Sequence, residues 1–245
     1  MIEQKVLIID DDFNLLQLAS LIFKKAGAQV ITASDGLDGI GKIFTDRPDL
    51  IILDVMMPGN DGFDVCQRIR QVSNDPLIML TALNREQDML KGLAAGADDF
   101  LTKPFNPEIL LARARTVLRR IRHSNGRYGS NGNNRSAAYF SYNDGYLSID
   151  IERHEVVIHG KRIKLTPIEF RLLAYLARNG GKLLTFDKIL ANVWGDQYQG
   201  SIDYVHVYIS RLRRKIKAGA KSSRYIMTIH GLGYVFEKHE LIYKP

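Results

Sequence analysis

The sequence predicts an N-terminal α/β domain with a doubly wound, five-stranded parallel sheet, followed by a smaller α+β domain. Three observations support this prediction. Short apolar runs alternate with helix-period segments as far as residue 121, a segment rich in Gly, Asn and Ser follows, and short strands then precede a set of helices and a hairpin. At 245 residues the chain is long enough for each domain to bury a core of its own.

The first half alternates strand-length and helix-length segments. We expect strands at 6–10, 30–33, 50–54, 77–81 and 100–102, and helices near 14–26, 36–45, 62–71, 85–95 and 107–121. The strand segments are almost continuously apolar, which is typical of parallel strands with helices on both faces of the sheet. The predicted fold is therefore a doubly wound α/β domain over residues 1–121.

The segment "HSNGRYGSNGNNRSAA", residues 123–138, differs in composition from the rest of the chain. Ten of its sixteen residues are Gly, Asn or Ser, and it has no apolar period. Such a composition favours a flexible linker. We expect the linker at 122–139 and the second domain at 140–245.

After the linker, three short strand segments come in a row: "YLSID", "EVVIH" and "RIKLT". Helices are expected near 167–178, 186–193 and 202–217. The last element is a hairpin over "YIMTIHGLGYVFE", whose turn contains Gly231 and Gly233. Strands, helices and a final hairpin together indicate a small α+β domain.

The net charge of +7 is unevenly distributed along the chain. Residues 1–120 carry 14 Lys and Arg against 17 Asp and Glu, whereas residues 121–245 carry 20 against 10. A basic second half indicates a polyanionic partner such as nucleic acid, although basic surface can also serve solubility alone. The single cysteine, Cys66, cannot form an internal disulfide, and no apolar run approaches the ~20 residues of a membrane span. We therefore expect a cytoplasmic protein without membrane contact.

Polar side chains cluster at the expected ends of the parallel strands. Asp10, Asp11 and Asp12 end the first strand, Asp54 ends the third, Thr81 ends the fourth, and Lys103 follows the fifth. Ligands of open α/β sheets bind at this edge. Crowded carboxylates repel one another unless a hard cation such as Mg²⁺ lies among them, and a lysine can pair with a phosphoryl oxygen. We therefore expect a Mg²⁺ site with Asp54 as a nucleophile; the alternative for any single aspartate is a helix cap or a turn.

The segment "SIDYVHVYISRLRRKIK" is expected to form an amphipathic helix with a basic second half. Its apolar residues are spaced 3, 4, 3 and 4: Ile202, Val205, Ile209, Leu212 and Ile216. Such a helix can lie in the major groove of DNA, where it reads bases and holds phosphates. Taken alone, the basic run that includes Arg211, Arg213 and Arg214 fits a solvated helix face equally well.

Four motifs in the first half, "VLIIDDD", "LIILDVMMPGNDG", "IMLTA" and "ADDFLTKPF", are similar to the receiver domain of bacterial two-component response regulators. The resemblance implies that Asp54 accepts a phosphoryl group from a sensor histidine kinase, with Thr81 and Lys103 as catalytic residues that contact the phosphoryl oxygens. Such a receiver catalyses only its own phosphoryl transfer and slow autodephosphorylation, so we do not expect an enzyme. The implied metal ligands are Asp10, Asp11, Asp54 and the carbonyl of Met56, and the implied switch residues are Thr81 and Phe100.

Three motifs in the second half, "KLTPIEFRLLAYL", "SIDYVHVYISRLRRKI" and "HGLGYVF", are similar to the winged-helix domain of the OmpR/PhoB family. The resemblance implies an N-terminal four-stranded sheet, a recognition helix at about 202–217 and a wing hairpin that reaches the minor groove. The segment 194–200 matches one that touches RNA polymerase in activators, although a core position explains Trp194 better. Together with the basic run, the resemblance predicts these DNA-binding residues: Tyr208, Ser210, Arg211, Arg213, Arg214, Thr228 and His230.

The resemblance also implies a homodimer that forms on phosphorylation through the fourth helix, fifth strand and fifth helix of the receiver. Asp99 and Arg113 match one ion pair of this interface, whereas Met89 and Ile109 are apolar where the family has a second pair. Burial of an apolar side chain can contribute ~1.5–3 kcal/mol, against ~0–1 for an exposed ion pair, so we expect a dimer that is less sensitive to salt. Alternatively, Met89 and Ile109 only cover the core of their own receiver.

The sequence thus favours a phosphorylation-dependent transcriptional regulator that binds double-stranded promoter DNA as a dimer. A phosphatase or phosphotransferase that uses Asp54 is an alternative, but haloacid-dehalogenase-like enzymes need Asp-x-Asp, and the chain has Asp54-Val55-Met56. A regulator that binds DNA without phosphorylation is the third hypothesis, which the complete set of acidic residues disfavours.

Overall fold

The computed structural model describes residues 2–57, 60–82, 86–124, 140–216 and 225–239. The chain divides into two compact units, Met1–Arg119 and Arg120–Pro245. The helix that begins at Pro107 continues to Ser124, beyond the expected boundary at residue 121. The remainder of the expected linker, residues 125–139, lies outside the described residues.

The first unit is a doubly wound α/β fold, as the sequence predicts. Among the described residues, five parallel strands lie in the order β2-β1-β3-β6-β7, so their carboxyl ends share one edge of the sheet. These strands are β1 (Lys5–Ile9), β2 (Gln29–Ala33), β3 (Leu50–Asp54), β6 (Leu77–Thr81) and β7 (Asp99–Thr102), and a short hairpin of β4 (Met56–Met57) and β5 (Asn60–Asp61) follows β3.

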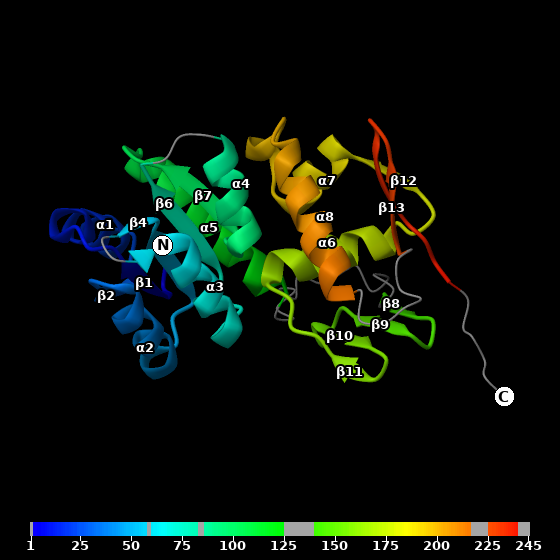
Figure 1. The fold of residues 1–245 in the computed structure, drawn as a ribbon, viewed down its shortest axis with the longest axis horizontal. Coiled ribbons are helices and arrows are strands. Elements are labelled where there is room, and N and C mark those ends of the chain that lie inside the picture. Colours follow the sequence, from blue (N-terminus) through cyan, green and yellow to red (C-terminus); the bar gives the residue numbers. More distant parts are fainter. Residues whose placement is uncertain (1, 58–59, 83–85, 125–139, 217–224, 240–245) are drawn as a thin grey trace, which may run out of the picture. The chain divides into compact units, whose positions relative to one another are not determined.

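Helices cover both faces of this sheet (Figure 1). They are α1 (Phe13–Lys25), α2 (Gly36–Asp46), α3 (Gly62–Val72), α4 (Glu86–Ala95) and α5 (Pro107–Ser124). Right-handed crossovers place α1 on one face and α2, α3 and α4 on the other, where successive helices contact one another. Every residue from Leu50 to Leu53 is fully buried, which accounts for the continuous apolar run in the sequence.

The second unit is an α+β fold with two antiparallel sheets, of order β11-β10-β9-β8 and β12-β14-β13. Its elements are β8 (Ser141–Asn143), β9 (Leu147–Asp150), β10 (Glu155–Ile158), β11 (Lys161–Arg162), α6 (Pro167–Arg178), β12 (Leu183–Thr185), α7 (Phe186–Val193), the 3₁₀ turn η1 (Asp196–Tyr198), α8 (Ile202–Ile216), β13 (Ile226–Ile229) and β14 (Gly233–Phe236). No helix among the described residues of either unit has the length and apolarity that a membrane span requires.

The sequence pattern differs from the structure at three short strands of the second unit, and none of the predicted strand segments covers the first of them, β8. The expected strand "RIKLT", residues 162–166, overlaps β11 only at Arg162, because Thr166 already forms a capping box at the start of α6. The pattern does not show β12, whose three residues pair with β14. A Cβ at Gly233 would lie 2.0 Å from the carbonyl oxygen of Leu184, so this close strand pairing requires glycine.

Candidate functional site

The acidic residues of the first unit meet at the carboxyl edge of the parallel sheet. One carboxylate oxygen each from Asp10, Asp11 and Asp54 lies within 4.8 Å of the others, an arrangement that could hold a metal ion. Asp10 and Asp54 are only 1% and 3% exposed, whereas Asp11 is exposed. The strand register explains the arrangement. Because Ile9 of β1 pairs with Leu53 of β3, the two strands end side by side, and Asp10 and Asp54 are the next residues.

Lys103 bridges the two buried carboxylates. Its Nζ lies 2.9 Å from Asp10 Oδ2 and 2.9 Å from Asp54 Oδ1. Burial alone would lower the pKa of Lys103, but the two carboxylates outweigh this effect and raise the pKa above its ordinary value. Burial raises the pKa of Asp10 and the charge of Asp54 adds to this effect, although the hydrogen bond from Lys103 opposes it. The site thus holds more negative charge than one ammonium balances.

Asp12 is a helix cap, the alternative function considered for a single aspartate in this run. Its Oδ1 accepts hydrogen bonds from the backbone N–H groups of Asn14 (2.8 Å) and Leu15 (3.3 Å). Its own N–H donates to Asp10 Oδ1 over 2.9 Å. Asp12 therefore starts α1 and also helps to orient Asp10.

The other predicted residues of this site lie on neighbouring strands. Thr81 is fully buried at the end of β6, and its carbonyl oxygen accepts a 2.6 Å hydrogen bond from the N–H of Lys103. Phe100, which is 6% exposed on β7, packs in the apolar core. Met56 follows β3 and is 53% exposed. The Lys103–Pro104 peptide bond is cis.

Gly62 is a residue of this site that the sequence analysis did not single out. A Cβ at Gly62 would lie 2.5 Å from both the carbonyl oxygen of Asp54 and the Cα of Val55. The N–H of Gly62 donates to the carbonyl oxygen of Val55 over 3.0 Å. The start of α3 therefore packs directly on the backbone that carries Asp54. The available clue in the sequence was that Gly62 directly follows Asp61, a residue type that often caps the start of a helix.

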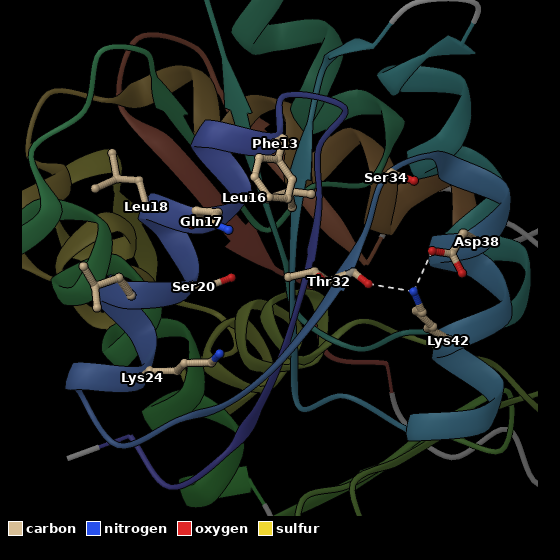
Figure 2. A pocket seen from close by; sticks show the side chains of 11 residues that line it. Phe13, Leu16, Gln17, Leu18, Ser20, Lys24, Thr32, Ser34, Asp38 and Lys42 are labelled. Carbon is tan, nitrogen blue, oxygen red and sulfur yellow. Dashed lines mark hydrogen bonds and ion pairs between the residues drawn. The ribbon is translucent and has the colours of Figure 1, made fainter.

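A separate hollow of the first unit lies between α1, β2 and α2 (Figure 2). Lys42 crosses one side of it, where its Nζ donates to the carbonyl oxygen of Thr32 (2.7 Å) and to Asp38 Oδ2 (2.6 Å). Most of the remaining lining comes from apolar and polar side chains of α1, including Phe13 and Leu21. Because neither an acidic cluster nor Lys103 lines this hollow, we place the reactive site at the sheet edge.

In the second unit, α8 has one wide buried face and one exposed face. The buried residues are Tyr204, Val205, Tyr208, Ile209, Arg211, Leu212 and Ile216. The exposed face carries His206, Ser210 and Arg214, each four residues from the next. Two of the predicted DNA-binding residues, Ser210 and Arg214, therefore lie on the accessible face, together with a histidine that the sequence analysis missed.

Two of the predicted DNA-binding residues, Tyr208 and Arg211, are buried in the second unit. Tyr208 is 0% exposed and Arg211 is 5% exposed. Arg211 Nη2 pairs with Glu169 Oε1 at 2.8 Å, and the guanidinium carbon lies 4.8 Å from the centre of the Tyr208 ring. To reach DNA, both side chains would have to leave the core and Arg211 would have to give up a buried ion pair.

Glu169 organises this buried pair and was also missed. It is 0% exposed, and its Oε2 accepts hydrogen bonds from Lys215 Nζ (2.6 Å) and from the N–H of Thr166 (2.8 Å). Burial would raise the pKa of Glu169, but the charges of Arg211 and Lys215 reverse this effect and lower it. The Thr-x-x-Glu capping-box pattern at 166–169 was visible in the sequence.

The wing residues and α8 are joined by Arg213. Its Nη2 donates to the carbonyl oxygen of Ile226 (2.6 Å) and to Thr228 Oγ1 (2.8 Å). Arg213 and Thr228 are therefore half-buried and paired within the domain, whereas His230 is exposed in the turn between β13 and β14. Trp194 is 1% exposed, as expected for a core residue.

The predicted dimer residues are divided between surface and core. Asp99 is 0% exposed, and its Oδ1 pairs with Arg113 Nη1 of the same chain at 2.8 Å. Met89 is half-buried and packs against the core of the receiver, which agrees with the alternative considered for it. Ile109 is 47% exposed.

Two family models match the chain. The response regulator receiver domain matches residues 6–115, and the C-terminal domain of transcriptional regulatory proteins matches residues 160–236. The chain belongs to the two-component response regulators of the OmpR/PhoB type. It is a DNA-binding transcriptional response regulator and not a member of a catalytic enzyme family. This class implies a kinase partner and DNA binding.

Relatives of known name resemble the chain over nearly its whole length. The alkaline phosphatase synthesis transcriptional regulatory protein PhoP of Bacillus subtilis is 39% identical over 97% of this chain and 98% of its own. The DNA-binding response regulator MtrA of Mycolicibacterium paratuberculosis is 36% identical over 94% of this chain and 97% of its own. A solved structure of a RitR mutant is 26% identical with a TM-score of 0.74, covering 96% of this chain and 100% of that one.

Proposed function

We propose that this regulator acts in the cytoplasm, where it accepts a phosphoryl group on Asp54 from a sensor histidine kinase and then binds promoter DNA as a homodimer. The observation that supports this best is the buried carboxylate of Asp54, which lies beside Asp10 and Asp11 and 2.9 Å from the ammonium of Lys103. A carboxylate on a rigid strand end beside a cation is suited to attack a phosphoryl group and to stabilise the product.

We further propose that Asp10, Asp11, Asp54 and the backbone carbonyl of Met56 hold Mg²⁺. The donors are all oxygens, which this hard cation prefers. The raised pKa of Asp10 supports the assignment, because burial and the charge of Asp54 both disfavour the ionised carboxylate and a divalent cation would remove that penalty. When bound, Mg²⁺ would supply positive charge beside the transferred phosphoryl group.

In the reaction, a carboxylate oxygen of Asp54 would form a bond to phosphorus as the bond from phosphorus to the histidine nitrogen of the kinase breaks. The nitrogen would keep the electron pair. Lys103, which holds its proton firmly, and the hydroxyl of Thr81 would then donate to the phosphoryl oxygens. Slow hydrolysis of the acyl phosphate would return the receiver to its resting state, and this is the only catalysis that we assign.

Thr81 and Phe100 would transmit the effect of phosphorylation to the dimer face formed by α4, β7 and α5. Phe100 lies next to α4, since a Cβ at Gly92 would be 3.3 Å from its ring. Exposed Ile109 and half-buried Met89 supply apolar surface on this face, and the Asp99–Arg113 pair supplies charge. DNA would meet Ser210 and Arg214 on α8 and His230 on the wing, and the exposed residues of 194–200 remain a candidate contact for RNA polymerase.

Beryllofluoride titration tests the proposal as a whole. A DNA duplex is first recovered with the full chain by selection from genomic fragments, and its affinity is then measured as beryllofluoride and Mg²⁺ are added. We expect the affinity to rise for the wild type and to stay constant for Asp54→Asn. A wild-type affinity that does not change would favour the alternative regulator, which binds DNA without phosphorylation.

A further inference from the structure

The exposed face of α8 carries a histidine whose ring is held by the wing sheet. His206 Nδ1 lies 2.7 Å from the hydroxyl oxygen of Tyr234, a residue of β14. The ring of Phe186 packs edge-on against the imidazole, with 5.1 Å between the ring centres. His206 is nevertheless exposed, so one side of the ring is fixed and the other side is accessible.

The hydrogen bond to Tyr234 determines which ring nitrogen carries the proton. Tyr234 is 3% exposed, and among the described residues its hydroxyl has a single hydrogen-bond partner, His206 Nδ1. A buried hydroxyl without an acceptor is unfavourable, so the hydroxyl donates to Nδ1 and the neutral imidazole carries its proton on Nε2. Burial raises the pKa of Tyr234, although Arg213 opposes this, so the hydroxyl keeps its proton at neutral pH.

The outer edge of His206 is therefore a hydrogen-bond donor on the accessible face of α8. Ser210 and Arg214 follow it at one-turn intervals on the same face. In the major groove, a single donor of this kind finds an acceptor on either purine, since guanine and adenine both present N7.

We propose that His206 is a specificity-determining residue whose Nε2–H donates to a purine in the major groove, and that Tyr234 is a positioning residue that selects this tautomer. The inference rests on the proposed binding of DNA through α8. A purely structural histidine would pack in the same place, but its loss would not change which base is preferred.

Selection from a pool of randomised duplex DNA tests this inference. The full chain is treated with beryllofluoride, and sites are selected with the wild type, His206→Ala, Tyr234→Phe and a control, His159→Asn. His159 is an exposed histidine outside α8 with φ 50°, a conformation that asparagine tolerates well. Fluorescence of Trp194, the single tryptophan of the chain, reports whether the second unit of each variant is folded.

We expect the wild type and His159→Asn to select the same consensus. His206→Ala should lose the purine preference at one base pair and bind the wild-type consensus roughly 2- to 10-fold more weakly, as expected for one hydrogen bond, with unchanged binding to unrelated DNA. Tyr234→Phe should weaken the same preference to a smaller degree, and it provides the test if His206→Ala does not fold.

Two results would overturn the inference. One is a His206→Ala consensus that matches the wild type at every position, and the other is an equal loss of affinity for all sequences, which would indicate a phosphate contact or a packing role. A wild type that selects no consensus would instead remove the proposed binding of DNA, and this inference with it. If Arg214→Ala, measured as a further variant, weakens DNA binding while His206→Ala retains the wild-type consensus, the proposed function stays intact and only the role of His206 is rejected.

Discussion

Asp54 of the receiver and Glu169 of the DNA-binding unit are both carboxylates with almost no exposed surface, yet their surroundings differ. Asp54 shares one ammonium, that of Lys103, with Asp10, and Asp11 lies close by. Glu169 faces two cations of its own domain. The first cluster has an excess of negative charge that a cation can balance, whereas in the second, one carboxylate already has two cationic partners. Burial of a carboxylate therefore marks a candidate cation site only when the protein supplies too few cations of its own.

The largest effect that follows from this difference is on the stability of the DNA-binding unit. Glu169→Ala would leave Arg211 buried without its carboxylate, and we expect a loss of ~3–5 kcal/mol in the free energy of unfolding. Urea denaturation followed by the fluorescence of Trp194 measures this unit, since the chain has one tryptophan.

The control for this prediction replaces both partners. Glu169→Leu combined with Arg211→Met keeps the core filled without a lone charge, and it should cost much less than Glu169→Ala alone. If Glu169→Ala unfolds within ~0.5 kcal/mol of the wild type, as an ordinary surface substitution does, then the pair with Arg211 does not stabilise the core.

The carboxylates of Glu169 and Asp10 should also change the stabilities of their units in opposite directions as the pH falls. The pKa of Glu169 is lowered from 4.5 by folding, so its contribution to stability is present above about pH 4.5 and is lost as the pH falls through the folded value. The pKa of Asp10 is raised from 3.8, so its ionised form destabilises the receiver at neutral pH, and this penalty disappears as the pH falls through the raised value toward 3.8.

Calorimetry of the full chain between pH 7 and about pH 3 can separate these effects, with Trp194 fluorescence assigning the transition of the second unit. Asp10→Asn should stabilise the receiver at neutral pH without Mg²⁺, because it removes the negative charge that burial and Asp54 disfavour. It should also remove the stabilisation by added Mg²⁺. A receiver destabilised by Asp10→Asn, or one that Mg²⁺ still stabilises, would contradict the charge imbalance at this site.

A smaller effect concerns Arg214, the exposed arginine of α8. Arg214→Ala should weaken DNA binding at all sequences and reduce the slope of log affinity against log salt by about 1, because an exposed phosphate contact is lost. Arg178→Ala, an exposed arginine at the end of α6, is the matched control and should leave the slope unchanged. An unchanged slope for Arg214→Ala would remove this residue from the DNA interface.

The smallest expected effect concerns the salt dependence of the activated dimer. Ile109 is a better probe than Met89, because Met89 also packs in the core of its own receiver. We expect Ile109→Asp to prevent dimerisation of the beryllofluoride-treated chain, while Val72→Asp, at an exposed position of α3, leaves it intact. Sedimentation at low and high salt should show little change for the wild type. A dimer that dissociates in salt would indicate that ion pairs dominate the interface.

The acidic site could be predicted from the sequence because fold class and strand position determine it together. Once 6–10 and 50–54 are parallel neighbours, Asp10 and Asp54 must lie side by side, whatever their separation along the chain. The pairing of Lys103 with Asp10 spans 93 residues, and only the five-stranded topology brings it about.

The DNA-binding face could be predicted only in part. The DNA-binding residues were chosen by residue type, without regard to the face of α8 on which each one lies. Tyr208 and Arg211 follow Tyr204 at spacings of four and three, which places all three beside the apolar stripe. The same spacing rule applied to the opposite face would have found His206. The strand β12 has too few residues for a period, and its pairing with β14 is not local.

Intact mass after incubation with acetyl phosphate tests the central claim most directly. With Mg²⁺ present, the wild type should gain one phosphoryl group, and without Mg²⁺ the gain should be much slower. Asp54→Asn should gain none under either condition, while Asp12→Asn, which keeps a capping side chain, should react like the wild type. If Asp54→Asn gains a phosphoryl group as fast as the wild type, Asp54 is not the acceptor and the proposed function of the acidic site is wrong.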